Sequence, residues 1–441
     1  MSHRVIEAME RGLNLAQNEN TEANHYSLEF CSAFAYPFWI REQLAQILDG
    51  IVDADLCVES ILLVGSTARG ELCYVEEEKP YLFSDYELLI ITQGKVDRRR
   101  KTLLELRINR LGDHLNPQNP LFHVDVGWYV LPQLPGLVHT VAIFEQKETG
   151  KVVFGKDYRA LMPSITAESL NKKRLNEILY KRLWALLLYL PQGFFTNCLT
   201  PSTNRIAAYV LARNGLDLTT VLLPYEGVLL PTYAQRVRYL KENYANLEMA
   251  PFFGTDLLHF LTMCLEIRNS LIWEEPLLQI YTRLIHYLER SLDYLLFRQG
   301  YDSKCAIQTQ SHLIFDENLP ALAKIKRALR MFRGRLSLRR AFRWPRLPHK
   351  GLLTAGLLQM HRSMIAHLGG NPAEAQVALE QARSLLDSII SRPLSQPDSS
   401  EPFIEHWLSL RQDFGYLCWE FIRRQSPVFD ERIQALTNVY D

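Results

Sequence analysis

The spacing of apolar positions changes along the chain and divides it into regions. In the first 55 residues, Leu44, Ile47 and Ile51 recur at helical spacing, which predicts one amphipathic helix. From residue 56 to about 160, short continuous apolar runs alternate with a single helical pattern. Nearly every later segment has helical spacing. We therefore expect an α+β domain, with a short mixed sheet flanked by helices, followed by a large all-α region.

Within the α+β domain, three apolar runs are typical of strands. They cover residues 56–64, 85–92 and 121–131, and a helix is predicted over residues 96–115. Residues 138–146 and 151–154 are separated by a short turn sequence, Glu148-Thr149-Gly150, which predicts a hairpin.

The predicted helices of the all-α region cover residues 175–190, 204–214, 233–244, 255–272 and 277–297, with a helical hairpin in 351–390 broken at 369–372. We expect four parts: a helical lead-in (1–55), the α+β domain (56–160), a helical bundle (161–300) and a second helical region (301–441). A flexible linker rich in Ser and Pro is predicted at 391–402.

The overall charge gives no sign of a polyanionic partner. The 441 residues include 49 Lys and Arg and 49 Asp and Glu, so the formal net charge is zero and any such signal must be local. The strongest local candidate is residues 324–350, with eleven basic residues and no acid. This segment suits RNA, an anionic membrane surface or an acidic protein. The alternative is a basic segment packed against acidic parts of the same chain.

The cysteines and apolar runs favour a cytoplasmic protein. Seven cysteines are scattered without any CxxC pair, as expected for reduced thiols and not for a disulfide or metal framework. The N-terminal sequence has no signal-peptide core. The longest apolar stretches fall short of the roughly 20 residues that cross a bilayer, so we expect no transmembrane segment.

Acidic residues occur inside two of the predicted strands. Asp85 and Glu87 are two positions apart, so their side chains should project to the same side of a strand. Such a pair repels unless a cation neutralises it, and Mg²⁺ prefers carboxylate ligands of this kind. Asp125 would complete a cluster of three if its strand pairs beside the first. Alternatively, Asp85 ends a strand, Glu87 is solvated and Asp125 pairs with an arginine or with His123.

A small-residue turn follows the first predicted strand. Gly65 would let a phosphate approach the backbone closely, Ser66 could donate its hydroxyl, and Arg69 could pair with phosphate oxygens. The sequence "TARG" is expected to begin a helix there.

These segments together resemble the polymerase-β-like nucleotidyltransferase superfamily, chiefly its minimal and aminoglycoside-type branches. The motifs are "LLVGSTARGE", "SDYELLI" and "HVDVGWYV", and "IFEQKETGKVVFGKDY" is similar to the hairpin that often ends such domains. The resemblance covers residues 56–160, with a weaker likeness over 170–300. It implies that Asp85, Glu87 and Asp125 bind two Mg²⁺ ions, with Asp125 near the attacking hydroxyl. It also implies that Gly65, Ser66 and Arg69 hold the triphosphate.

The resemblance implies a Mg²⁺-dependent nucleotidyltransferase. It would move a nucleoside monophosphate from an NTP, by default ATP, to a hydroxyl of a small molecule, a protein or an RNA. One departure is the eighteen residues that separate Ser66 from Asp85. The extra loop at 71–83 is either a surface excursion or a substrate-contacting flap.

Two alternative functions remain open on the sequence. One is an inactive nucleotidyltransferase-like binding or scaffold protein. The other is an antitoxin-like nucleotidyltransferase fused to a HEPN-like helical module, because Arg362 and His367 have the five-residue offset of the HEPN ribonuclease motif. The segment "EIRNSLIW", which contains Arg268, has the same pattern but carries Trp273 where the histidine would be.

Overall fold

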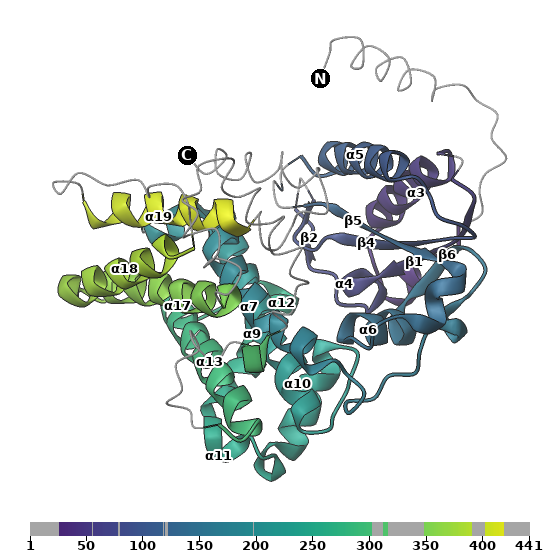
Figure 1. The fold of residues 1–441 in the computed structure, drawn as a ribbon. Helices are drawn as coiled ribbons and strands as arrows, with labels where there is room; N and C mark the ends of the chain where they lie inside the picture. The colour runs from purple at the N-terminus through teal and green to yellow at the C-terminus, as the bar shows by residue number, and fades with distance from the viewer. Residues whose placement is uncertain are drawn as a thin grey trace, which may run out of the picture.

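The structure of the chain, a computed structural model, confirms the coarse architecture. A small four-stranded sheet with its helices is followed by a large helical region (Figure 1). The described residues are 26–54, 56–77, 80–117, 119, 122–196, 198–301, 312–315, 348–389 and 402–418. Most of the basic segment 324–350 and of the predicted linker 391–402 lies outside these residues, so neither prediction is tested.

The sheet is mixed, with strand order β5-β4-β1-β6. Its strands are β1 (Val58–Val64), β4 (Tyr86–Thr92), β5 (Val124–Val130) and β6 (Lys151–Gly155). β4 and β5 run parallel, and the helix α5 (Arg98–Leu115) connects them, as a parallel pair requires. The β1–β4 and β1–β6 pairs are antiparallel. The three strands and the helix predicted here are confirmed, with ends that differ by a few residues.

Residues of β4 alternate between two cores. Tyr86, Leu88 and Ile90 are buried with α5 and α3 (Phe38–Val52), whereas Leu89 and Ile91 are buried on the other face of the sheet. α3 and α5 therefore cover one face together (Figure 1). Because α3 contributes to the core of the sheet, it belongs to the α/β unit in packing terms, although the sequence places it in a separate lead-in.

The predicted hairpin at 138–154 is wrong in its first half. Val141–Thr149 forms the helix α6, and only the second half, β6, is a strand, paired with β1. The Thr140 side chain accepts a hydrogen bond from the Ile143 amide and caps this helix. A nine-residue segment with only four apolar positions is too short for its periodicity to separate helix from strand.

The helical region contains the predicted helices and several short ones. The long helices are α7 (Lys172–Tyr189), α9 (Pro201–Tyr225), α10 (Tyr233–Asn243), α12 (Asp256–Ser270), α13 (Leu277–Arg298), α17 (His349–Leu368), α18 (Pro372–Asp387) and α19 (Phe403–Cys418). Its short helices are α8 (Gln192–Phe195) and α11 (Ala250–Phe253), with a 3₁₀ turn at Tyr244–Asn246. Before this region lie the short helices α2 (Phe30–Ala33) and α4 (Gly65–Ala68) and the 3₁₀ turns Leu131–Gly136 and Arg159–Leu161. α17 and α18 form the helical hairpin predicted at 351–390.

α9 is the central helix of this region and is longer than predicted. The sequence indicates an end near Gly215, but the helix continues to Tyr225. A Cβ at Gly215 would lie 2.6 Å from the Cys264 sulfur, so glycine here permits α12 to approach closely. Among the described residues, α9 alone is long and apolar enough to cross a membrane, and 94% of its apolar window is buried inside the structure. Burial in the core therefore accounts for the apolar composition of α9.

The extra loop at 71–83 forms a small hairpin of β2 (Tyr74–Val75) and β3 (Tyr81–Leu82). Glu77 pairs with Arg205 of α9 at 2.6 Å, and the rings of Phe83 and Tyr209 are 5.7 Å apart. The hairpin thus joins the α/β unit to α9, which gives the additional length a structural role.

Candidate functional site

The register of three strands brings together the acids predicted from the sequence. Glu87 of β4 is directly beside Asp125 of β5, and on its other side it faces Val64, the last residue of β1. Asp85 immediately precedes β4. The turn Gly65-Ser66 begins where β1 ends. The predicted phosphate turn therefore meets the predicted metal ligands at the ends of the strands, beside the C-terminus of β1 and the N-termini of β4 and β5.

Glycine is required at position 65 for two reasons. Its φ of +67° lies in the left-handed region that other residues avoid. A Cβ there would also be 2.3 Å from a carboxylate oxygen of Glu87. The turn and the acid are therefore in direct contact.

The helix predicted after this turn is a single turn, α4, so a long helix dipole does not contribute to the site. No side chain caps its first amides. The Ser66 side chain makes no hydrogen bond with the described residues, although the residue is only 8% exposed. The backbone amides and this hydroxyl are the groups that the turn could offer to a phosphate.

His123 lies between two of the acids. Its Nδ1 is 2.9 Å from Asp85 and its Nε2 is 3.2 Å from Asp125. Burial would lower the pKa of His123, but the two carboxylates outweigh that effect and raise it well above the usual value. The imidazolium thus neutralises part of the acidic charge, and the alternative pairing of Asp125 with His123 is present in the structure.

Asp125 lies inside the apolar run predicted as a strand over residues 121–131, yet its side chain is not buried. It is the second residue of β5, an edge strand, and its side chain is 62% exposed. An exposed carboxylate needs no buried partner, so its place in an apolar run is not by itself an indication of function. Its position beside Glu87 is the more informative observation.

Glu87 has no hydrogen bond or ion pair with any described residue. Burial raises its pKa, and repulsion from Asp125 adds to the rise, while Arg69 and Arg213 oppose it. A partly buried, unpaired carboxylate next to two other acids is a favourable position for a divalent cation.

The acids do not form a complete metal site by themselves. Among the residues that the structure describes, no group of three or more His, Cys, Asp or Glu side chains is placed so that it could hold a metal ion. Mg²⁺ is usually held by one or two carboxylates together with water and substrate phosphates. Glu87 and Asp125 could supply those carboxylates. Asp85 could also bind the ion if the ion replaced His123 as its partner.

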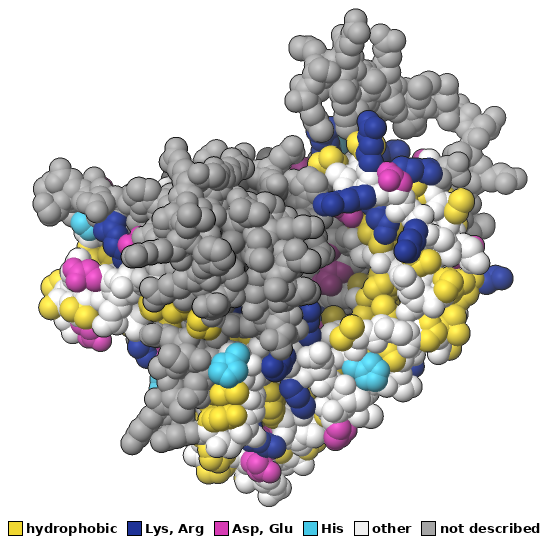
Figure 2. Space-filling view, in the orientation of Figure 1, with side chains coloured by type: hydrophobic (Ala, Val, Ile, Leu, Met, Phe, Trp, Pro, Cys, Tyr) yellow, Lys and Arg dark blue, Asp and Glu magenta, His cyan; other side chains and the backbone are white. Residues whose placement is uncertain are grey.

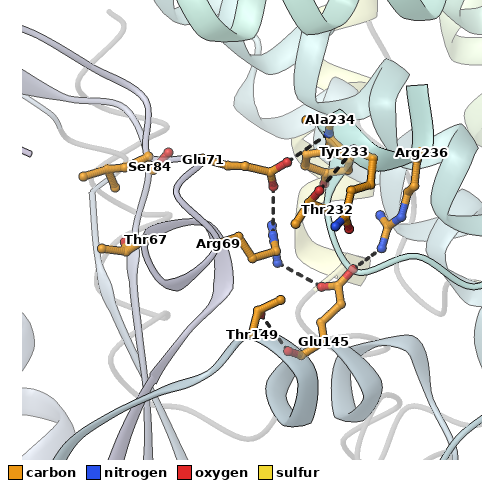
Figure 3. Close-up of polar contacts among 12 residues, drawn as sticks. Thr67, Arg69, Glu71, Ser84, Glu145, Thr149, Thr232, Tyr233, Ala234 and Arg236 are labelled. Carbon is orange, nitrogen blue, oxygen red and sulfur yellow. Dashed lines mark hydrogen bonds and ion pairs between the residues drawn. The ribbon is translucent and has the colours of Figure 1, made fainter. Parts of the chain in front are cut away.

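Arg69 is engaged by carboxylates of its own unit. Its guanidinium pairs with Glu71 at 2.8 Å and Glu145 at 2.9 Å, and Glu145 also pairs with Arg236 of α10 (Figure 3). Glu71 in turn accepts a hydrogen bond from the Ala234 amide. Arg69 therefore ties the turn to the helical region, and this bonding does not leave its guanidinium free for the predicted phosphate contact.

A different arginine reaches the acids. Arg213 of α9 approaches Asp85 at 3.8 Å, and its side chain is 37% exposed. It belongs to a polar row at four-residue spacing, Arg205, Tyr209, Arg213 and Asp217, on a helix whose residues are mostly apolar. The sequence analysis does not predict a functional role for Arg213. The four-residue spacing of the polar row is the signal that could have found it, because this spacing places the four side chains on one face of the helix.

Figure 2 shows the surface of the molecule in the orientation of Figure 1. A hollow lies between the α/β unit and the rest of the molecule, with an acidic side chain inside it and Lys and Arg side chains at its margin.

Arg362 and His367 do not form a common site. Arg362 pairs with Glu289 of α13, whereas the His367 ring stacks on Phe403 of α19 with centroids 4.4 Å apart. No hydrogen bond joins Arg362 to His367. A HEPN-like ribonuclease centre would need the two side chains in one cleft, so this geometry gives no support to that alternative.

Comparisons with protein-family models, with curated proteins and with solved structures found no match for the chain.

Proposed function

We propose that the chain is a Mg²⁺-dependent nucleotidyltransferase that moves a nucleoside monophosphate from an NTP, by default ATP, to a hydroxyl group. The observation that carries the proposal is the β1–β4–β5 register, which puts Glu87 beside Asp125 and against Gly65. Two carboxylates and a glycine turn at one sheet edge are the parts that such a reaction needs.

Each group would have a defined task. The turn amides and the Ser66 hydroxyl would hold the phosphates, and Asp85, Glu87 and Asp125 would hold Mg²⁺. The bound ions would neutralise negative charge on the phosphates and acidify the attacking hydroxyl. The acceptor oxygen would attack the α-phosphorus, the bond to the β-phosphate oxygen would break, and pyrophosphate would leave. Asp125, the most exposed of the three acids, is the one best placed to take the hydroxyl proton.

One observation favours a second candidate, a nucleotide-binding protein without turnover. His123 already pairs with Asp85 and Asp125, so the acidic charge is partly neutralised without an ion. An imidazolium that stayed in this position would compete with Mg²⁺ for two of the three carboxylates. Binding would then persist while transfer was lost.

The test is a transfer assay with the four NTPs labelled at the α-phosphate, Mg²⁺, and the protein, RNA or a metabolite extract as acceptor. We expect labelled product from the wild type and none from the double variant Asp85→Asn/Glu87→Gln. Asp157→Asn is a matched control, because Asp157 is an acid that pairs only with nearby Arg159. Nucleotide binding without product would favour the second candidate, and absence of both would refute the nucleotide site.

A further inference from the structure

Arg268 is a buried arginine without a counter-ion. It lies in the last turn of α12, and only 2% of its surface is exposed. Its Nε has no hydrogen-bond partner, and no carboxylate pairs with it. An ionised group in this situation is costly, and native proteins normally pair it.

The neighbouring arginines are all paired. Around Tyr233, the guanidinium groups of Arg69, Arg236 and Arg268 lie 5.5, 5.4 and 5.3 Å from the ring centroid. Arg69 and Arg236 share Glu145, and Arg213 pairs with Asp85. Among the described arginines of this cluster, Arg268 is the one whose charge no carboxylate offsets. Its position is therefore not explained by the network that joins the two parts of the protein.

The surroundings of Arg268 connect it to the candidate site on two sides. The Tyr233 ring, which Arg268 faces at 5.3 Å, is also faced by Arg69, which follows the phosphate turn, at 5.5 Å. On the other side, α12 packs closely on α9 where Gly215 meets Cys264. α9 carries Tyr209, whose hydroxyl is 3.3 Å from that of Ser84, the residue before Asp85.

Arg213 and Arg268 lie on two helices that pack together. Gly215, two positions after Arg213, packs against Cys264, four positions before Arg268, so the two cations come from parts of α9 and α12 that face each other. Like charges at such proximity repel, and an anion between them would relieve the repulsion. The Thr67 hydroxyl, which is fully buried and unpaired, is a further donor in the same turn.

The geometry points to an anion site at Arg268 and Arg213 that takes the β- and γ-phosphates of the bound NTP and then the leaving pyrophosphate. This inference rests on the proposed function for the identity of the ligand, although the site itself needs no metal. Arginine suits the task, because its guanidinium remains charged and can bind phosphate through two N–H groups. In this arrangement, the helical region would contact the nucleotide directly and would not only support the sheet.

The test is calorimetric titration of the full chain with inorganic tripolyphosphate in the presence of a chelator. We expect wild-type binding, at least a tenfold rise in Kd for Arg268→Met, and partial recovery for Arg268→Lys. Arg238→Met is the control, because Arg238 is an exposed arginine on α10, and it should bind like the wild type. The Tm of Arg268→Met should equal or exceed the wild-type value, since an unpaired buried charge has been removed.

The outcomes separate this inference from the proposed function. Unchanged tripolyphosphate binding by Arg268→Met, no binding by the wild type, or a fall in Tm of several degrees would overturn the anion site. The double variant Asp85→Asn/Glu87→Gln should lose transfer and keep metal-free tripolyphosphate binding. If the wild type fails to transfer nucleotide and Arg268 still governs tripolyphosphate binding, the anion site stands and the transferase does not.

Discussion

Several residues of this chain have contacts or backbone conformations that follow from the fold and cannot be read from the sequence. Gly65 is conspicuous in the sequence, yet its need for a positive φ and its contact with Glu87 follow from the β1–β4 register. Asp85 and Glu87 could be selected from their spacing, because side-chain alternation in a strand is a local property. Arg213 and Arg268 could not, because their partners come from distant segments. The sequence offers His123 as a partner of Asp125, but its contact with Asp85 depends on the fold.

Gly65→Ala should weaken nucleotide binding more than it weakens the fold. The substitution strains the backbone by about 1–2 kcal/mol and pushes the methyl group against Glu87. We expect at least a tenfold loss of NTP affinity in calorimetry. Gly370→Ala is a matched control, since Gly370 has a φ of +76° and no atoms near the added methyl group. Equal NTP affinity for the two variants would contradict the contact between the turn and the acid.

His361 should make stability depend on pH. It is fully buried, with its ring bonded to the Tyr281 hydroxyl at 2.7 Å and to the Leu183 carbonyl at 3.0 Å. Burial lowers its pKa to about 4, against about 6.5 in an unfolded chain. Between these values the unfolded chain binds the extra proton, so the stabilisation is complete above pH 6.5 and is lost as the pH falls towards 4.

The expected loss over this window is on the order of 3 kcal/mol. Denaturant unfolding at pH values from 4.5 to 7.5 measures it. His361→Gln should be less stable at pH 7.5, because its hydrogen bonds are altered, and should show a flatter dependence on pH. The same slope in the variant and the wild type would show that another group is responsible.

At the scale of elements, the sequence predicts secondary structure well where periodicity is long and poorly where it is short. α5 and the helical hairpin α17–α18 are confirmed because each has several turns of apolar spacing. α6 was missed because its nine residues fit a strand as well as a helix. The predicted end of α9 is wrong because glycine often ends a helix, whereas Gly215 lies inside this helix and allows α12 to pack closely against it.

Glu145 of α6 should be essential for joining the elements around the turn. It pairs with Arg69 after α4 and with Arg236 of α10, whose side chains are 9% and 3% exposed. Glu145→Gln would leave the buried Arg236 without a carboxylate and Arg69 with Glu71 alone, with an expected loss of about 3 kcal/mol in unfolding free energy.

Chemical denaturation measures this loss, and Glu248→Gln is its control. Glu248 pairs with Arg298 but is 71% exposed, so its replacement should cost less than about 1 kcal/mol. A similar small effect for Glu145→Gln would mean that the network in Figure 3 contributes little to the stability of the interface.

At the scale of the whole molecule, one face of the sheet and the helical region form a single core. The buried cluster that contains Leu62 and Leu89 of the sheet also contains Leu183 of α7 and Phe414 of α19. The change from strand to helix spacing in the sequence marks the two regions but does not reveal that they share an interior. Long-range packing of this kind depends on topology, which local patterns do not encode.

A fragment of residues 26–170 should therefore not fold as an independent domain. Without the helical region, one apolar face of the sheet would be exposed to water, and large exposed apolar patches favour aggregation. We expect no cooperative thermal transition and strong binding of a hydrophobic dye, in contrast with the full chain. A monomeric fragment with a sharp transition would contradict the shared core.

The central claim is that the edge of the sheet at Gly65, Glu87 and Asp125 binds a metal–nucleotide complex. The most direct measurement is anomalous diffraction from crystals grown with Mn²⁺ and a non-hydrolysable ATP analogue. We expect a Mn²⁺ peak within about 2.5 Å of the Glu87 and Asp125 carboxylates, phosphates at the turn, and His123 moved from between its two acids. A bound nucleotide without metal at these carboxylates, or no nucleotide at the turn, would contradict it.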